Sequence, residues 1–281
     1  MNLEEENSMN PESNKKYTEL FIIFTFTFGW ISSILLVLSG AGGGLIVTMS
    51  MPFLFAAIFN LIEYKSMKVL FQPFRKRVNL KSILFMFLYP IIIIALCSVL
   101  ALVTKQGALS ANWSDLLIKT VGLIPLSVIL FVIGLTEEYG WRGYLLPRLY
   151  ERYGLSKANI MVGIIWAMYH FPYLFILNLN SGIWSAVIFT ILQMLMIFMF
   201  NFGFSYLYLL SQNVILASIM HILWNNVNVQ VLGDTYRNTQ NSIILGNIKV
   251  INGECFYGLI FTSIFAIIAY RKFKNVKSTF S

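Results

Sequence analysis

Six polar side chains that could take part in chemistry lie within apolar stretches of the sequence. They are Glu137, Glu138 and Arg142 in one stretch, His170 in the next, and His221 and Asn225 in a third. The two histidines are the only ones in the chain. An ionisable side chain in apolar surroundings is costly unless it is paired or faces a wet cavity, so these residues indicate a functional site.

The spacing of these residues predicts how they are directed. Glu138 and Arg142 are four residues apart, which places them on one face of a helix where they can form an ion pair. Glu137 points about 100° away from Glu138 and is free to face a different neighbour. His221 and Asn225 are also four residues apart, so we expect both to point towards one place.

The attack of water on an amide is the chemistry that suits this set. A carboxylate can accept a proton from the water, and a neutral histidine can hold the water or donate a proton to the leaving amine. A second histidine and an amide can donate hydrogen bonds to the oxyanion. Two alternatives stay open: one glutamate and two histidines can bind a catalytic zinc, although HExxH is absent, and transporters use the same residue types as proton relays.

Composition indicates a membrane as the setting for this chemistry. The chain has 281 residues, of which 58% are hydrophobic and 11% are charged, whereas a soluble domain carries about 25% charged residues. The hydrophobic residues are concentrated in runs long enough to cross a bilayer as helices. The runs fall near 17–39, 44–63, 82–104, 118–147, 158–177, 183–210, 214–231 and 254–270. We therefore predict an all-α polytopic membrane protein with about eight transmembrane helices.

The expected organisation is a single transmembrane domain between two polar tails. A polar cytoplasmic tail at 1–16 precedes a transmembrane domain at 17–270, whose motif-bearing core covers about 118–231, and a basic cytoplasmic tail follows at 271–281. The least defined boundary divides the stretch 183–231. We place it at the polar turn 211–213, and the alternative is Asn201–Gly203.

The net charge of +8 predicts topology and not nucleic-acid binding, because the basic residues stand in short segments between apolar runs. With a cytoplasmic N-terminus, all of the 20 Lys and Arg lie on or towards the cytoplasmic side except Lys105, Lys119, Arg237 and Lys249. We therefore predict a multi-pass protein of the cell membrane with both termini in the cytoplasm. Counted at about 1.5 Å per residue along each helix, the carboxylate and both histidines fall in the cytoplasmic half of the membrane.

At these residues the sequence resembles the CPBP family, also called the ABI family, which comprises CAAX proteases and bacteriocin-processing enzymes and includes the type II CAAX prenyl endopeptidases. Glu137, Glu138 and Arg142 resemble the family's EExxxR motif. They belong to a longer stretch, EEYGWRGYLLPRL, that also resembles the family. The family's aromatic-xxx-His motif resembles Trp166 and His170, and its HxxxN motif resembles His221 and Asn225. The three motifs occur in the family's order.

The resemblance implies a role for each residue of the three motifs. Glu137 and His170 would activate the water, His221 and Asn225 would form the oxyanion site, and Glu138 and Arg142 would organise the cavity. It implies a glutamate-dependent mechanism with no cofactor, and zinc at Glu137, His170 and His221 is the alternative, since the family has also carried a metalloprotease label.

The function expected from these observations is an intramembrane endopeptidase whose substrate is a peptide or membrane protein held in the lipid bilayer. The alternative is a bacteriocin self-immunity or partner-binding protein on the same scaffold. Trp166 and the other aromatic residues are expected in the core or at the membrane interface. Asn226 could be a second donor in the cavity or a residue of the helix end. No role is predicted for the loop 233–253.

Overall fold

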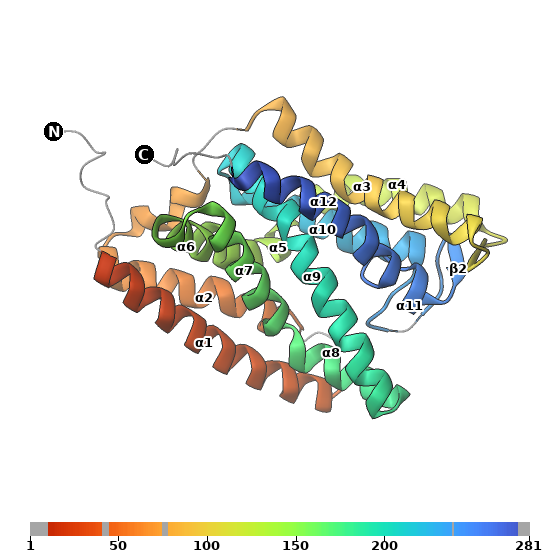
Figure 1. Cartoon of the computed structure of the whole chain (residues 1–281), viewed down its shortest axis with the longest axis horizontal. Helices are drawn as coiled ribbons and strands as arrows, with labels where there is room; N and C mark the ends of the chain where they lie inside the picture. Colours follow the sequence, from red (N-terminus) through yellow and green to blue (C-terminus); the bar gives the residue numbers. More distant parts are fainter. Residues whose placement is uncertain (1–10, 41–44, 75–77, 238, 275–281) are drawn as a thin grey trace.

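The structure is a computed structural model that describes residues 11–40, 45–74, 78–237 and 239–274. Six of its helical segments are long and apolar enough to cross a membrane. Five are the single helices α1 (Pro11–Leu38), α2 (Leu45–Tyr64), α3 (Leu80–Val103), α9 (Ile183–Ser211) and α10 (Val214–Leu232), and the sixth joins α11 (Ile248–Ile251) to α12 (Phe256–Lys274). The chain is thus an all-α polytopic membrane protein (Figure 1).

Two further spans are broken helices. The first combines α4 (Trp113–Ile129) with α5 (Phe131–Glu138), the π-helical segment η3 (Tyr139–Leu145) and α6 (Leu146–Tyr153), and bends by 57° after α4. The second combines α7 (Leu155–Tyr169) with α8 (Phe171–Asn178) and the short η4 (Leu179–Ser181), and bends by 41° after α7. Counting each bent pair as one span gives up to eight spans in the described part of the chain, the number that the sequence predicts.

The turn that divides the stretch 183–231 lies where we predicted it. Helix α9 ends at Ser211, Gln212 adopts a left-handed conformation with φ of 46°, and the side chain of Asn213 accepts a hydrogen bond from the backbone of Ile215 at 2.8 Å. The alternative break at Asn201–Gly203 is wrong, because α9 continues through these residues. An asparagine N-cap stabilises the start of a helix, which explains why the chain turns at 211–213.

The ends of the transmembrane domain differ in detail from the expected boundaries at 17 and 270. Helix α1 begins at Pro11, so residues 11–16 of the expected tail are helical, and α12 extends to Lys274. The remaining residues of both expected tails, 1–10 and 275–281, lie outside the described residues. Outside the helical spans, the 3-10 segment η2 (Met67–Phe74) follows α2, and strands β1 (Gly107–Leu109) and β2 (Ile244–Gly246) pair antiparallel.

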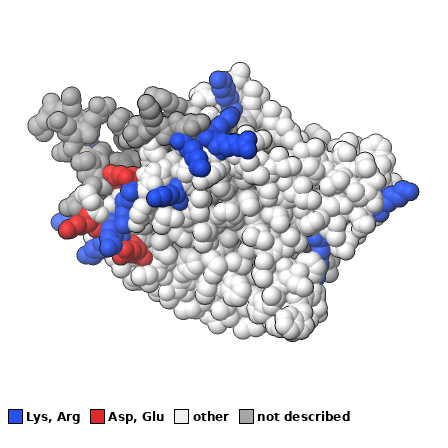
Figure 2. Space-filling view, in the orientation of Figure 1, with Lys and Arg blue, Asp and Glu red and all other residues white. Residues whose placement is uncertain are grey.

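The outer surface of the bundle matches a lipid environment. Figure 2 shows Lys, Arg, Asp and Glu near the extremities of the molecule, with a broad uncharged zone between them. Large hydrophobic side chains are exposed on the spans, as in Leu35 (62%), Val99 (58%) and Ile188 (61%). Water would not tolerate so large an apolar surface, whereas lipid tails cover it without cost.

Helix α10 is the interior helix of the bundle and carries His221 and Asn225. In its apolar window 67% of the residues are buried, against 22% to 50% in the other five unbroken spans. It packs against α3, α4, α5 and α9. The approach of α5 to α10 requires a glycine, because a Cβ atom at Gly134 would lie 2.7 Å from the carbonyl oxygen of Ser218. The α5 backbone therefore lies directly against the turn of α10 that precedes His221.

Candidate active site

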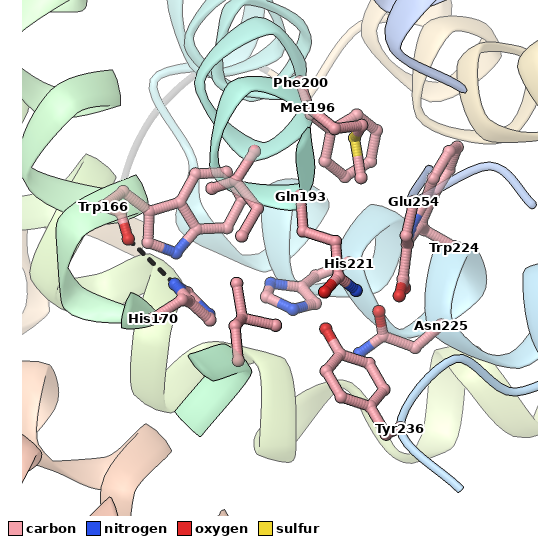
Figure 3. Close-up of a pocket in the computed structure, with 12 residues that line it drawn as sticks. Trp166, His170, Gln193, Met196, Phe200, His221, Trp224, Asn225, Tyr236 and Glu254 are labelled. Carbon is pink, nitrogen blue, oxygen red and sulfur yellow. Dashed lines mark hydrogen bonds between the residues drawn. The ribbon is translucent and has the colours of Figure 1, made fainter. Parts of the chain in front are cut away.

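A polar cavity lies between the broken span α7–α8 and helices α9 and α10. It has a volume of about 420 Å³, its open mouth included. Its lining consists of Trp166, His170, Leu174, Gln193, Met196, Ile197, Phe200, His221, Trp224, Asn225, Tyr236 and Glu254. Figure 3 shows His221 near the centre of this group. Three of the predicted site residues, His170, His221 and Asn225, therefore share one cavity although they come from two different spans.

The break after α7 sets the orientation of His170. In a continuous α-helix the backbone N–H of His170 would bond to the carbonyl of Trp166, but here it bonds to Ala167, at 3.2 Å. The freed carbonyl oxygen of Trp166 lies 2.8 Å from Nδ1 of His170 (Figure 3). A carbonyl can only accept, so Nδ1 carries a proton, and the neutral tautomer of this ring has its lone pair on Nε2.

Glu138 binds two cationic or polar partners at once. Arg142 Nη1 lies 3.1 Å from its Oε2, and both side chains are fully buried, which confirms the ion pair predicted from their spacing. His221 Nδ1 lies 2.8 Å from Oε1 of the same carboxylate. The carboxylate accepts from Nδ1, so the other ring nitrogen of His221 is the one left for the cavity. The sequence did not predict this contact between α5 and α10.

Arg142 is held from several sides, as a buried guanidinium must be. Its guanidinium carbon lies over the rings of Trp166 and Phe204, at 4.1 and 4.6 Å from their centroids. Its Nη2 donates to Oδ1 of Asn201 at 2.9 Å. The amide of Asn201 in turn donates to Oδ1 of Asn159 at 2.8 Å. These contacts replace the solvation that a charge loses on burial.

Glu137 lies beside the cavity and contacts one residue of its wall. The carboxylate is 2% exposed, and its Oε2 accepts a hydrogen bond from Nε1 of Trp166 at 3.0 Å. Trp166 also lines the cavity. Trp166 thus contacts both predicted groups, bonding to Glu137 through its indole N–H and to His170 through its backbone carbonyl. Trp166 was expected as the aromatic residue of its motif and in the core or at the interface; it is a core residue with 3% exposure, and its N–H in addition bonds to the predicted base.

Asn226 does not contribute to the cavity. Its side chain donates to Ser127 Oγ of α4 at 3.0 Å and is absent from the cavity lining. It ties α10 to α4, and it is neither a second cavity donor nor a residue of the helix end, because α10 continues to Leu232.

Tyr236, Glu254 and Gln193 are lining residues that sequence reasoning missed. Tyr236 comes from the loop 233–253, to which we assigned no role, Glu254 directly follows this loop, and Gln193 lies within α9. Glu254 stands at the first position of the expected apolar run 254–270. A carboxylate at that border was the one sequence signal that could have drawn attention to it.

The potential zinc ligands do not form a common metal site in this geometry. Over residues 11–40, 45–74, 78–237 and 239–274, no group of three or more His, Cys, Asp or Glu side chains could hold a metal ion. Glu137 Oε2 accepts a hydrogen bond from Trp166, and both histidines bond within the protein through Nδ1, which leaves Nε2 as the nitrogen that a metal would use. Zinc needs at least three protein ligands at about 2 Å in a catalytic site.

Fold and site together define a polytopic membrane protein with a partly open cavity between its spans, lined by polar and apolar side chains. Comparison with known proteins makes this assignment specific. The family model for type II CAAX prenyl endopeptidase Rce1-like proteins matches residues 119–227. CAAX prenyl protease 2 of Methanococcus maripaludis is 30% identical over 245 residues, which cover 79% of this chain and 88% of the relative.

The chain therefore belongs to the Rce1-like type II CAAX prenyl endopeptidase family, and it is an intramembrane protease. The family resemblance expected from the three motifs is confirmed. The matched region contains all six predicted site residues, whereas Tyr236 and Glu254 lie beyond its end.

Proposed function

We propose that this protein is a metal-independent endopeptidase that cleaves a peptide bond near the C-terminus of prenylated, membrane-anchored CAAX-type proteins, with water activated by Glu137 and His170. The observation that carries the proposal is the single cavity lined by His170, His221 and Asn225, with Glu137 bonded to the indole in its wall. The relative is named for CAAX prenyl substrates, and a cavity enclosed by membrane spans suits a peptide held at the bilayer by a lipid chain.

The proposed reaction needs only side chains and water. Glu137 accepts a proton from water while the water oxygen bonds to the carbonyl carbon. The resulting oxyanion accepts hydrogen bonds from Nε2–H of His221 and from the side-chain amide of Asn225. Breaking the C–N bond releases the amine, which takes up the transferred proton through His170. The second proton of the water leaves the new carboxylic acid for the amine, so the products are a carboxylate and a protonated amine.

In this mechanism Glu138 acts on His221 and not on the substrate. An oxyanion donor at Nε2 requires both nitrogens of the imidazole to be protonated. Glu138, at 2.8 Å from Nδ1, favours that charged form by its own negative charge. Arg142 lies 3.1 Å from Oε2 of the same carboxylate and offsets its negative charge. The ion pair predicted from spacing thus organises the oxyanion site.

The test is cleavage of an internally quenched peptide that carries a farnesylated CAAX terminus, by protein purified and reconstituted in lipid vesicles. We expect Glu137→Gln and His170→Ala to lower kcat by about 10²-fold or more, because each removes a group that transfers the proton. His221→Ala and Asn225→Ala should each lower kcat by about 10²–10³-fold, the usual cost of losing an oxyanion donor.

Asn226→Ala is the matched control for Asn225→Ala. It removes an amide from the next position of the same helix, but this amide bonds to Ser127 outside the cavity. We expect its kcat to stay within about twofold of wild type, since it makes no contact with the reacting groups. Full activity in Glu137→Gln or His170→Ala would contradict the proposed mechanism, and a farnesylated peptide left intact by wild-type protein would contradict the proposed substrate.

A further inference from the structure

Gln193 is a buried polar residue in the membrane-spanning helix α9. Its side chain has a relative exposure of 7% and lines the cavity. Ile188 and Ile191, on the other side of the same helix, are 61% and 53% exposed on the outer surface, so the amide lies on the inner face of α9. An amide that leaves water needs hydrogen-bond partners to offset the lost solvation. The partners of Gln193 must therefore come from inside the bundle.

Asn178 fixes the orientation of the Gln193 amide. Asn178 Nδ2 donates to Gln193 Oε1 at 3.2 Å and to the carbonyl of Leu174 at 2.8 Å. A side-chain amide nitrogen can only donate, so the oxygen of Gln193 faces Asn178 and its Nε2 is left for the cavity. In the part of the chain that the structure describes, this nitrogen makes no hydrogen bond. Gln193 thus offers the cavity a donor of fixed direction.

Asn225 and Tyr236 present further polar groups at the same end of the cavity. Figure 3 shows the side-chain amides of Gln193 and Asn225 and the phenol of Tyr236 directed towards the region beside the His221 ring. Among the described residues, neither the Asn225 amide nor the Tyr236 hydroxyl makes a hydrogen bond. A ligand that fills this end of the cavity must therefore supply acceptor oxygens, which a peptide main chain carries at every residue.

We propose that Gln193 binds the substrate by donating a hydrogen bond from Nε2 to the carbonyl oxygen of one of the two backbone amides that flank the cleaved bond. The inference rests on the proposed peptidase function and adds a substrate-binding residue to it. A carbonyl that enters the cavity loses water and needs a donor in its place. Every peptide has this acceptor, so Gln193 recognises an extended main chain and not a particular side chain.

The proposed role of Gln193 differs from that of the oxyanion donors. A flanking carbonyl keeps its bonding and its charge throughout the reaction, so Gln193 binds the substrate and the transition state equally well. Such uniform binding lowers KM and leaves kcat unchanged. His221 and Asn225, in contrast, act on the oxyanion that exists only during the reaction and contribute to kcat.

Three farnesylated, internally quenched peptides, all with a free C-terminal carboxylate, test this inference. The parent peptide has an unchanged backbone, and in each of two analogues an (E)-alkene replaces one flanking amide, which keeps the shape and removes the carbonyl oxygen. Reconstituted wild-type protein should cleave one analogue with a kcat/KM about tenfold below that of the parent, because the Gln193 donor is then left unpaired. Equal values for all three peptides would overturn the proposal with wild-type protein alone.

Gln193→Met tests whether this difference comes from Gln193. Methionine keeps the length of the side chain and removes the donor, so KM for the parent peptide should rise about tenfold while kcat stays within about twofold of wild type. The parent and the sensitive analogue should then have equal kcat/KM values. A merely structural role of Gln193 would lower both values by the same factor and leave their ratio as in wild type.

Two further variants complete the comparison. Thr190→Val is the matched control on α9, since the buried hydroxyl of Thr190 makes no hydrogen bond within the described residues and does not line the cavity. Its KM and its ratio of parent to analogue should equal those of wild type. Asn178→Leu keeps the Gln193 donor but removes the partner that orients it, so the ratio should fall by a smaller factor than in Gln193→Met.

The outcomes distinguish this inference from the proposed function. A wild-type ratio in Gln193→Met, or in Asn178→Leu where Gln193→Met does not fold, would overturn the inference and leave the peptidase function intact. A lower kcat with an unchanged KM in Gln193→Met would also overturn it, because Gln193 would then act on the oxyanion. Failure of the wild-type protein to cleave the parent peptide would contradict the proposed function itself.

Discussion

Nδ1 of His221 lies 2.8 Å from Oε1 of Glu138, and this contact joins the interior helix α10 to the broken span that carries the EExxxR motif. The same carboxylate binds Arg142 at 3.1 Å, in a position from which solvent is excluded. One buried negative charge is therefore shared between an imidazole and a guanidinium. The first prediction concerns the removal of this charge.

Glu138→Gln should reduce both activity and stability. The amide can still accept a hydrogen bond, but it no longer favours the protonated His221 and leaves Arg142 buried without a counter-charge. We expect kcat on the farnesylated peptide to fall about 10²-fold and the free energy of unfolding to fall by about 3–5 kcal/mol. Glu19→Gln, which removes an exposed carboxylate on α1, is the control. Activity equal to wild type in Glu138→Gln would disprove its role in positioning His221.

Asn201→Leu should destabilise the protein through Arg142. It removes the acceptor of Arg142 Nη2 inside the bundle, and a lost hydrogen bond to a charged group costs about 1.5–3 kcal/mol. Asn226→Ala removes a hydrogen bond between two neutral side chains and should cost only about 1 kcal/mol. Thermal unfolding of both variants in the same detergent measures the difference. Equal melting temperatures would argue against a role of Asn201 in compensating the guanidinium.

Gly134→Val should push α5 away from α10. The new side chain would begin 2.7 Å from the carbonyl oxygen of Ser218 and 3.4 Å from Cβ of His221, and such overpacking costs about 1–3 kcal/mol. We expect lower kcat as well, because the distance between His221 and Glu138 must increase. Gly122→Val on α4 is the matched control, since nothing lies within 4 Å of a Cβ atom there. A fully active Gly134→Val protein would show that the close approach is dispensable.

Activity should persist after metal removal. The proposed reaction uses Glu137 and His170 as proton carriers, and the described His, Cys, Asp and Glu side chains do not form a three-ligand cluster. Dialysis of the purified protein against a strong chelator, followed by elemental analysis and a peptide-cleavage assay, checks this expectation. Loss of activity that stoichiometric zinc restores would establish zinc as the catalytic group and overturn the metal-free mechanism.

The predicted orientation can be measured by cysteine labelling. Cys97 and Cys255 are buried, at 0% and 2% exposure, so they should give little background. We expect the cysteine of Gln106→Cys to react with a membrane-impermeant maleimide on intact cells, and that of Lys157→Cys to react only after lysis. Both positions are exposed, and most basic residues share the side of Lys157. The reverse pattern would place both termini outside the cell.

The residues of the three motifs and the number of spans could be predicted from the sequence. The length of an apolar run predicts a transmembrane span directly. The four-residue spacing of Glu138 and Arg142 predicts a contact within one helix. The breaks at Leu130 and His170 were not predicted: we expected continuous helices over 118–147 and 158–177, and this expectation is wrong. Neither break is marked by glycine. At the break near His170, Pro172 lacks the backbone N–H that would continue helix α7.

Contacts between segments distant in sequence could not be predicted from the local sequence pattern either. The bond from Trp166 to Glu137 and the entry of Tyr236 and Glu254 into the cavity depend on how the chain folds back on itself. Helical periodicity describes which face a side chain occupies, and it does not say which other helix that face meets. All six candidate groups could therefore be named from the sequence, but among their bonding partners only the pair of Glu138 and Arg142 could be predicted.

The π-helical segment η3 (Tyr139–Leu145) determines where the first broken span can lose a residue. Its backbone N–H at Leu146 bonds to the carbonyl of Trp141, five residues earlier, so it holds more residues per turn than an α-helix does. Glu138, which precedes this segment, contacts His221 of α10, and Arg148, which follows it, forms an ion pair with Glu63 of α2. Because this turn takes up one residue more than an α-helical turn, deleting one residue here should restore an ordinary α-helix and leave Glu138 and Arg148 in phase with their partners, whereas a deletion in α5 or α6 would rotate one half of the span against the other by about 100°.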